Sequence, residues 1–189
     1  MAALSCSLPV QKRMWPRMQR LEFALLHLLR ALSNPKMDRF MILVSKLGNV
    51  AGIWLALIAA LMAVPKWRKT GKTVLYAMVM DVISCNLLLK NLIHRQRPCD
   101  VTDQHHINRP IGGSFPSGHT AAGATITSAL FFCRSILWFP CAVLTSLIGV
   151  SRMYLNVHYP SDIFGAALFG TFFGRMGWKV THKEKGETE

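Results

Sequence analysis

The chain has 189 residues, 51% of them hydrophobic, and its 22 Lys and Arg against 9 Asp and Glu give a formal net charge of +13. The hydrophobic residues form runs of membrane-spanning length, separated by short Lys- and Arg-rich stretches. This pattern excludes a water-soluble core and predicts one all-α domain, an integral membrane helical bundle. The basic residues are spread over loops and ends instead of one exposed face, so no nucleic-acid partner is expected.

The first predicted helix covers Leu21 to Leu32, within an N-terminal basic segment of residues 1–37. Its apolar stretch is too short to cross about 30 Å of hydrocarbon as a straight helix. Two alternatives remain open: an interfacial amphipathic helix, or a short span extended by snorkelling of Arg20 and Arg30.

Five further apolar runs are predicted to cross the membrane, which gives a bundle of five to six transmembrane helices. They cover roughly Met41 to Val64, Thr73 to Ile93, Ser117 to Phe132, Ile136 to Val150 (continuing toward Leu155) and Ile163 to Trp178. The last run is rich in Gly, which favours close helix packing in lipid. Residues 38–178 form the expected transmembrane core, and residues 179–189 form a cytoplasmic tail.

The basic loops predict the orientation of the bundle. The loop from Pro65 to Lys72 and the C-terminal tail each carry several Lys and Arg residues, so both are expected on the cytoplasmic side. The loops after Lys90 and after Ser151 then lie on the opposite face. The same rule favours a spanning Leu21 to Leu32 segment, and therefore six crossings.

Polar and ionisable residues, which are costly at membrane depth, collect in three blocks at this opposite face. The blocks are Lys90 to Pro98, Pro116 to His119 and Ser151 to Asp162. A single such residue would be a snorkelling anchor or an ordinary helix-boundary residue. The three blocks together predict a binding site for an anion.

The chemistry of these side chains indicates a phosphate group. Lys90, Arg97 and Arg152 supply positive charge, and arginine offers planar, bidentate donors to phosphate oxygens. Ser117 and Gly118 lie where a helix begins, so free backbone N–H groups and the helix dipole also favour an anion. These five residues are the predicted phosphate ligands.

Two histidines complete the predicted site. Asp162 follows His158 by four residues, close enough for its carboxylate to accept a hydrogen bond from one ring nitrogen and leave the other free to attack phosphorus. His119 would protonate the leaving oxygen and later activate water. Arginine, lysine and backbone donors would stabilise the transition state, so no metal or other cofactor is expected.

The motifs Lys-x6-Arg-Pro, Pro-Ser-Gly-His and Ser-Arg-x5-His-x3-Asp, in this order, resemble the three signature motifs of the type 2 phosphatidic acid phosphatase family. The resemblance implies a metal-independent lipid phosphatase with His158 as nucleophile, His119 as acid and Asp162 as the orienting carboxylate. It also implies a multi-pass protein of the cell membrane whose site faces the extracytoplasmic side, with a lipid phosphate as substrate. The short chain is similar to small bacterial members that act on undecaprenyl diphosphate.

Several alternatives remain at the level of sequence. Phosphatidylglycerophosphate, phosphatidate and lipid A phosphates are possible substrates, and a lipid hydroxyl could replace water as phosphate acceptor. Vanadium haloperoxidases use a similar constellation but are soluble, and a transporter would carry its charges through the bundle. The sequence does not indicate an oligomeric state or the lipid tail.

Other residues have weaker interpretations. Asp81 is expected to bond a neighbouring helix or Asn86, whereas His94, Arg95 and Arg109 could either steer an anionic headgroup or serve a structural role. His105 and His106 lack acidic or Cys partners at ligand spacing, so they predict a polar loop and not a metal site. The five cysteines show neither zinc-ligand spacing nor a disulfide framework.

Overall fold

The computed structural model describes residues 16–49, 52–104 and 106–182, which form an all-helical bundle with no strand among them. In chain order the elements are α1 (Pro16–Ala31), α2 (Pro35–Leu47), α3 (Gly52–Ala63), η3 (Pro65–Trp67), α4 (Arg68–Asp81), η4 (Val82–Leu89), α5 (Lys90–Leu92), α6 (Pro98–Thr102), α7 (Gly118–Phe132), α8 (Trp138–Tyr154) and α9 (Pro160–His182). The predicted runs from Thr73 onward correspond to α4 to α5, α7, α8 and α9.

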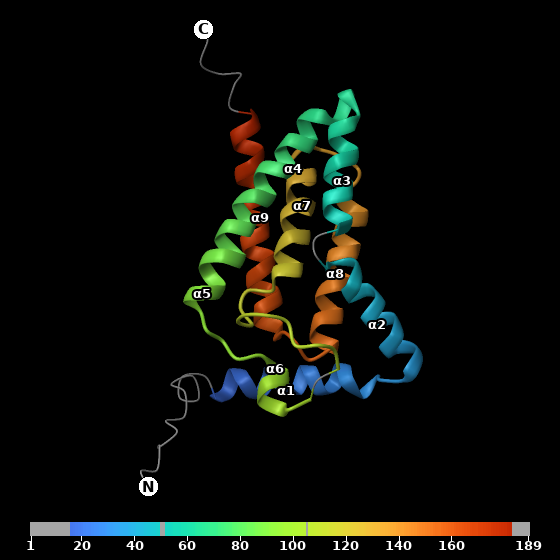
Figure 1. The fold of residues 1–189 in the computed structure, drawn as a ribbon, viewed down its shortest axis with the longest axis vertical. Coiled ribbons are helices and arrows are strands. Elements are labelled where there is room, and N and C mark those ends of the chain that lie inside the picture. The colour runs from blue at the N-terminus through green and yellow to red at the C-terminus, as the bar shows by residue number, and fades with distance from the viewer. Residues whose placement is uncertain (1–15, 50–51, 105, 183–189) are drawn as a thin grey trace.

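Helix α7 lies in the middle of the bundle and packs against α4, α8 and α9 (Figure 1). Its contact with α9 depends on small residues. A Cβ atom added at Gly170 would lie 2.6 Å from the Cβ of Ala124, and one at Gly174 would lie 2.6 Å from the Cβ of Ser128. The glycines of the last predicted run therefore allow close approach of two helices, as the sequence indicated.

Replacing Gly174 by alanine is expected to destabilise the bundle by about 1 to 3 kcal/mol, because the new Cβ would meet Ser128 Cβ and the backbone nitrogen of Ala129 at 2.6 and 2.7 Å. The matched control is Gly52→Ala at the start of α3, where an added Cβ meets nothing within 4 Å. Thermal unfolding in detergent should show a lower Tm for Gly174→Ala alone. Equal melting of the two variants would contradict the packing argument.

The single span predicted over Met41 to Val64 is instead divided between α2 and α3, whose axes differ by 45°. Gly48 follows α2, and a Cβ added there would lie 2.8 Å from Cδ2 of His119. The end of α2 thus lies directly against the predicted active site. The apolar pattern could not reveal this bend, because both helices carry apolar residues.

By length and hydropathy alone, fewer of the described helices qualify as membrane spans than the sequence predicted. The continuous helix Pro65–Leu92, which includes the π-helical η4, has 28 residues and is long and apolar enough to cross a membrane. The bent α2–α3 pair would make a second such stretch among the described residues. Helices α7 and α8 have 15 and 17 residues. The predicted count of five to six spans is therefore not confirmed.

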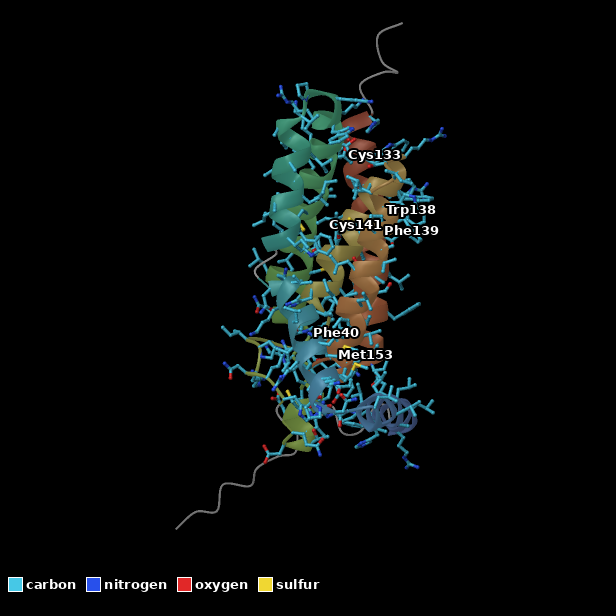
Figure 2. All side chains as sticks on the ribbon, turned by 90° about the vertical axis from the view of Figure 1, so that its right-hand side faces the viewer. Phe40, Cys133, Trp138, Phe139, Cys141 and Met153 are labelled. Atoms are coloured by element: carbon cyan, nitrogen blue, oxygen red, sulfur yellow. The ribbon has the colours of Figure 1, made fainter. Side chains whose placement is uncertain are left out.

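Large apolar side chains nevertheless lie on the outside of the bundle. Phe40, Phe139 and Phe164 are each about half exposed or more, with exposed fractions of 47%, 59% and 68%. Figure 2 shows side chains projecting outward along the whole length of the bundle, with Phe139 on α8 among them. Such a surface is unfavourable in water and suits an apolar surrounding.

Helix α1 crosses the lower end of the bundle in Figure 1 instead of running along it. Leu21, Leu25 and Leu28 are exposed on this helix, whereas Glu22 and Leu26 are buried against the bundle. One apolar face therefore points away from the protein. This arrangement favours the interfacial alternative for Leu21 to Leu32 over a sixth crossing.

Candidate active site

The three polar blocks meet at the end of the bundle that α1 crosses. His119, at the start of α7, lies within electrostatic range of Arg152, His158, Lys90 and Arg97. These residues come from the end of α8, the α8–α9 turn, α5 and the loop before α6. The structure therefore brings together side chains that are up to about 70 residues apart in sequence.

His158 lies in the turn between α8 and α9 and is 2% exposed. Its Nε2 atom is 3.2 Å from Nη1 of Arg97. Because a guanidinium can only donate, Nε2 must accept and carry the ring's lone pair. Burial lowers the pKa of His158 to about 4, against the opposing effect of Asp162. The imidazole is therefore neutral at neutral pH, with its lone pair directed toward a positively charged group.

The carboxylate of Asp162 holds a central position in the site. Its Oδ2 atom accepts hydrogen bonds from Ser114 Oγ at 2.5 Å and from the backbone N–H of Tyr159 at 2.8 Å. The Nδ1 atom of His158 lies 3.5 Å from the same oxygen. The predicted Asp162–His158 hydrogen bond is therefore long in this structure, because other donors already occupy Oδ2. Such contacts commonly tighten when substrate binds.

Arg97 is 1% exposed, and its guanidinium donates to backbone carbonyls. The acceptors are Val157 at 2.9 Å, Gly113 at 3.0 Å, and Gly112 and Ile111 at 3.3 Å each. Burial lowers the pKa of Arg97 from its usual value. Carbonyl dipoles fix the guanidinium in place without neutralising its charge, and that charge favours an anion beside His158.

Arg152, at the end of α8, is 2% exposed. Its Nη1 atom donates to Ser45 Oγ of α2 at 2.6 Å, while its Nε atom has no hydrogen-bond partner within the described part of the chain. A buried N–H without a partner is costly unless a ligand accepts from it. This orphaned donor is consistent with the predicted role of Arg152 as a phosphate ligand.

Lys90, Gly118 and Ser117 complete the predicted set. A Cβ added at Gly118 would lie 2.6 Å from Oδ1 of Asn86 and 3.2 Å from Nζ of Lys90, so the glycine is needed for this close approach. Ser117 is buried and precedes the first turn of α7, and its Oγ accepts from Thr120 at 3.2 Å. Backbone N–H groups of a first helical turn have no intrahelical partner and are available to an anion.

His119 contacts a residue that the sequence analysis did not identify. Its Nε2 atom lies 2.8 Å from Oδ1 of Asn49, just after α2. Together with Ser45 beside Arg152 and Gly48 against the His119 ring, Asn49 makes the end of α2 a wall of the site. No local motif could indicate this, because Ser45 and Asn49 are more than 65 residues from their partners.

A second group that the sequence analysis did not assign lies behind Asp162. Arg95 donates from Nη1 to Asp162 Oδ1 and to Ser161 Oγ, both at 2.6 Å, and from Nη2 to Glu22 Oε2 of α1 at 2.7 Å. Ser161 Oγ also donates to Glu22. Arg95 is therefore engaged with two carboxylates, which supports the structural alternative for this residue.

The remaining candidates lie outside the site or are structural. Arg109 forms an exposed ion pair with Asp100, with contacts of 2.6 and 2.8 Å, and His94 is exposed. Asp81 is fully buried, and its carboxylate faces Cys85 and Thr125, the latter on the neighbouring helix α7. Of the two expected partners, this supports the neighbouring helix and not Asn86. His105 lies outside the described residues.

Comparison with known proteins places this fold and site in a family. The PAP2 superfamily matches residues 70–185, a segment that includes all the predicted site residues. The chain therefore belongs to the PAP2 superfamily. Because its relatives are phosphatases acting on lipids, it is a lipid phosphatase, and the resemblance of the three motifs is confirmed.

Individual relatives are similar over most of their length. The undecaprenyl-diphosphatase BcrC of Bacillus subtilis is 26% identical over 78% of this chain and 77% of its own. The decaprenylphosphoryl-5-phosphoribose phosphatase of Mycobacterium tuberculosis is 35% identical over 65% of this chain and 67% of its own. The crystal structure of Aquifex aeolicus LpxE superposes with a TM-score of 0.74 and 26% identity, covering 84% of this chain and 95% of that one.

Proposed function

We propose that this chain hydrolyses a phosphate monoester or diphosphate on a membrane lipid through a phosphohistidine intermediate, with undecaprenyl diphosphate as the leading substrate. The observation that carries this proposal is the position of His158. Its accepting nitrogen lies 3.2 Å from Arg97, and its other nitrogen faces Asp162. The proposed nucleophile, the His158 ring, thus has an anion-binding cation at one nitrogen and an orienting carboxylate at the other.

In the first step, Nε2 of His158 attacks the terminal phosphorus, forming a P–N bond as the P–O bond to the leaving group breaks. The electron pair of the broken bond passes to the leaving oxygen, which takes a proton from His119. In the second step His119 removes a proton from water. The water oxygen attacks phosphorus, the P–N bond breaks, and inorganic phosphate leaves.

The charge that develops on the phosphoryl oxygens is stabilised by Lys90, Arg97, Arg152 and the N-terminal turn of α7, including Ser117 and Gly118. Both arginines are fixed before substrate arrives. Arg152 is held by Ser45 and keeps a free Nε donor, whereas Arg97 is held by carbonyls and contributes mainly its positive charge. Fixed donors need little reorganisation during the reaction. We therefore expect the reaction to proceed without a metal ion.

The lipid substrate is proposed from the substrates that the names of the relatives specify. One relative is an undecaprenyl-diphosphatase, and another is a decaprenylphosphoryl-5-phosphoribose phosphatase. Both names specify a polyprenyl lipid, although the second also places a phosphate on a ribose. Lipid A phosphatases and a phosphatidylglycerophosphatase are also similar to this chain. Those lipids, phosphatidate and transfer to a lipid hydroxyl remain the alternatives.

The arrangement of charge supports a multi-pass cell-membrane protein whose site faces the extracytoplasmic side. The α3–α4 turn, with Lys66, Arg68 and Lys69, lies at the end of the bundle opposite α1 and the site, and the end of α9 with Lys179 lies there too (Figure 1). Basic residues of short loops favour the cytoplasm. The interfacial α1 would then lie in the outer leaflet.

The test is phosphate release in detergent from undecaprenyl diphosphate, phosphatidylglycerophosphate, phosphatidate and lipid A, with and without EDTA. We expect release from undecaprenyl diphosphate to be fastest and to be unchanged by EDTA, because the cationic side chains supply the charge stabilisation. Loss of activity in EDTA would refute the metal-free mechanism. A preference for another lipid of the set would replace the proposed substrate while leaving the chemistry intact.

A further inference from the structure

A cavity of about 400 Å³ opens beside the proposed phosphate site, on the side of His119. Its polar lining consists of Ser45, Lys46, Asn49, Asn108, His119 and Arg152. This volume lies within the range of small-ligand pockets. The general acid, one phosphate ligand and the end of α2 therefore face a common space.

The cavity is positively charged. Arg152 and Lys46 both line it, and no acidic side chain does so among the described lining residues. Neither cation forms an ion pair with a carboxylate in the described part of the chain. Because Arg152 and its unpartnered Nε atom are already assigned to the terminal phosphate, Lys46 is the remaining cation that lines this space. The positive charge of this cavity would stabilise a second anionic group of the substrate.

The position of His119 indicates which part of the substrate enters the cavity. In the proposed mechanism His119 protonates the leaving oxygen, so the leaving group must lie on the His119 side of the phosphorus. That side is the cavity, where Asn49 holds the His119 ring at 2.8 Å. A lipid alcohol would bring no charge here, whereas a lipid diphosphate would bring its second phosphate.

We propose that this cavity is a subsite for the lipid-proximal phosphate of a diphosphate, with Lys46 as the residue that distinguishes diphosphates from monophosphates. This inference rests on the proposed function. When the bridging P–O bond breaks, its electron pair passes to the bridging oxygen, which takes the proton from His119 and leaves as part of a lipid monophosphate. Lys46 stabilises the negative charge on the non-bridging oxygens of that phosphate. A monophosphate substrate gains nothing from this charge, because its leaving group is an alcohol.

The experiment measures kcat/KM for a polyprenyl diphosphate and for the monophosphate of the same chain length. Lys46→Met should lower kcat/KM for the diphosphate about 10- to 100-fold, the loss expected for one charge-assisted hydrogen bond, and change the monophosphate value less than about 2-fold. Lys46→Arg should retain the preference. The control Lys36→Met, at an exposed position of the same helix, should behave as wild type. Equal losses for both lipids, or none, would overturn the subsite.

A binding measurement separates this inference from the proposed function. Inorganic pyrophosphate should raise the Tm of the wild type more than orthophosphate does, and Lys46→Met should abolish that difference. If neither lipid is hydrolysed but the pyrophosphate preference depends on Lys46, the subsite stands and the proposed activity fails. If lipids are hydrolysed but pyrophosphate shows no Lys46-dependent preference, the activity stands and the subsite is refuted.

Discussion

His158→Ala is expected to lower kcat for lipid phosphate hydrolysis by roughly 10⁴-fold or more, the scale seen when an enzyme's nucleophile is removed. The reason is local. Nε2 accepts from Arg97 and is neutral at neutral pH, since burial lowers the pKa of His158 to about 4. Alanine removes this nucleophile without introducing a substitute. Phosphate release under saturating substrate provides the measurement.

A matched control is available in His94→Ala, because His94 is exposed in the loop between α5 and α6. It should retain wild-type kcat. Rapid acid-free quenching of the wild type with ³²P-labelled lipid should trap label on the protein, and His158→Ala should trap none. Activity of His158→Ala comparable to that of the control would refute the phosphohistidine route.

The predicted catalytic set lies together in the structure because each motif is local and lies at a helix end. His158 and Asp162 are separated by one turn, and Arg152 precedes them on the same helix–turn–helix. Residues that bind one phosphate must gather at one face, and alternating spans place these blocks at the same end. The spacing of the motifs and their placement at helix ends were therefore enough to predict which side chains gather in one place.

The supporting residues could not be predicted in this way. Glu22, Ser45 and Asn49 come from α1 and from the end of α2, far from their partners in sequence. Nothing in the spacing of a single polar residue in an apolar run indicates its partner. The bend between α2 and α3 was hidden for a related reason: apolar residues on both sides continue the run, while Gly48 lies against His119.

The role of α1 also depended on tertiary structure. Its sequence allowed either a short span or an interfacial helix, and charge alone favoured the span. The structure shows α1 across the end of the bundle (Figure 1), with Glu22 directed inward to Arg95. The buried ion pair between Glu22 and Arg95 fixes the orientation of α1. The charges of the loops could not indicate this pair.

Arg95→Met is expected to lower both stability and activity, because it leaves two carboxylates without their shared cation. Arg95 lies 2.6 Å from Asp162 and 2.7 Å from Glu22, whose side chains are 0% and 6% exposed. Breaking a buried ion pair by removing one partner costs about 3 to 5 kcal/mol. We expect a clear fall in Tm. We also expect kcat to fall roughly 100-fold with KM less affected, since a misplaced positioning group costs about this much.

The matched control is Arg109→Met, which breaks the exposed ion pair with Asp100 and should change the free energy of unfolding by about 1 kcal/mol or less.

Comparison with Glu22→Gln then separates positioning of Asp162 from general destabilisation of the bundle. If Glu22 acts through Arg95, the loss of kcat in the double variant Glu22→Gln/Arg95→Met should be smaller than the sum of the single losses. Full additivity would mean that α1 stabilises the bundle without positioning Asp162. Wild-type kcat and Tm in Arg95→Met would refute the network altogether. A sub-additive result would connect α1, the helix across the end of the bundle, to the carboxylate beside the proposed nucleophile through Arg95, which belongs to none of the three motifs.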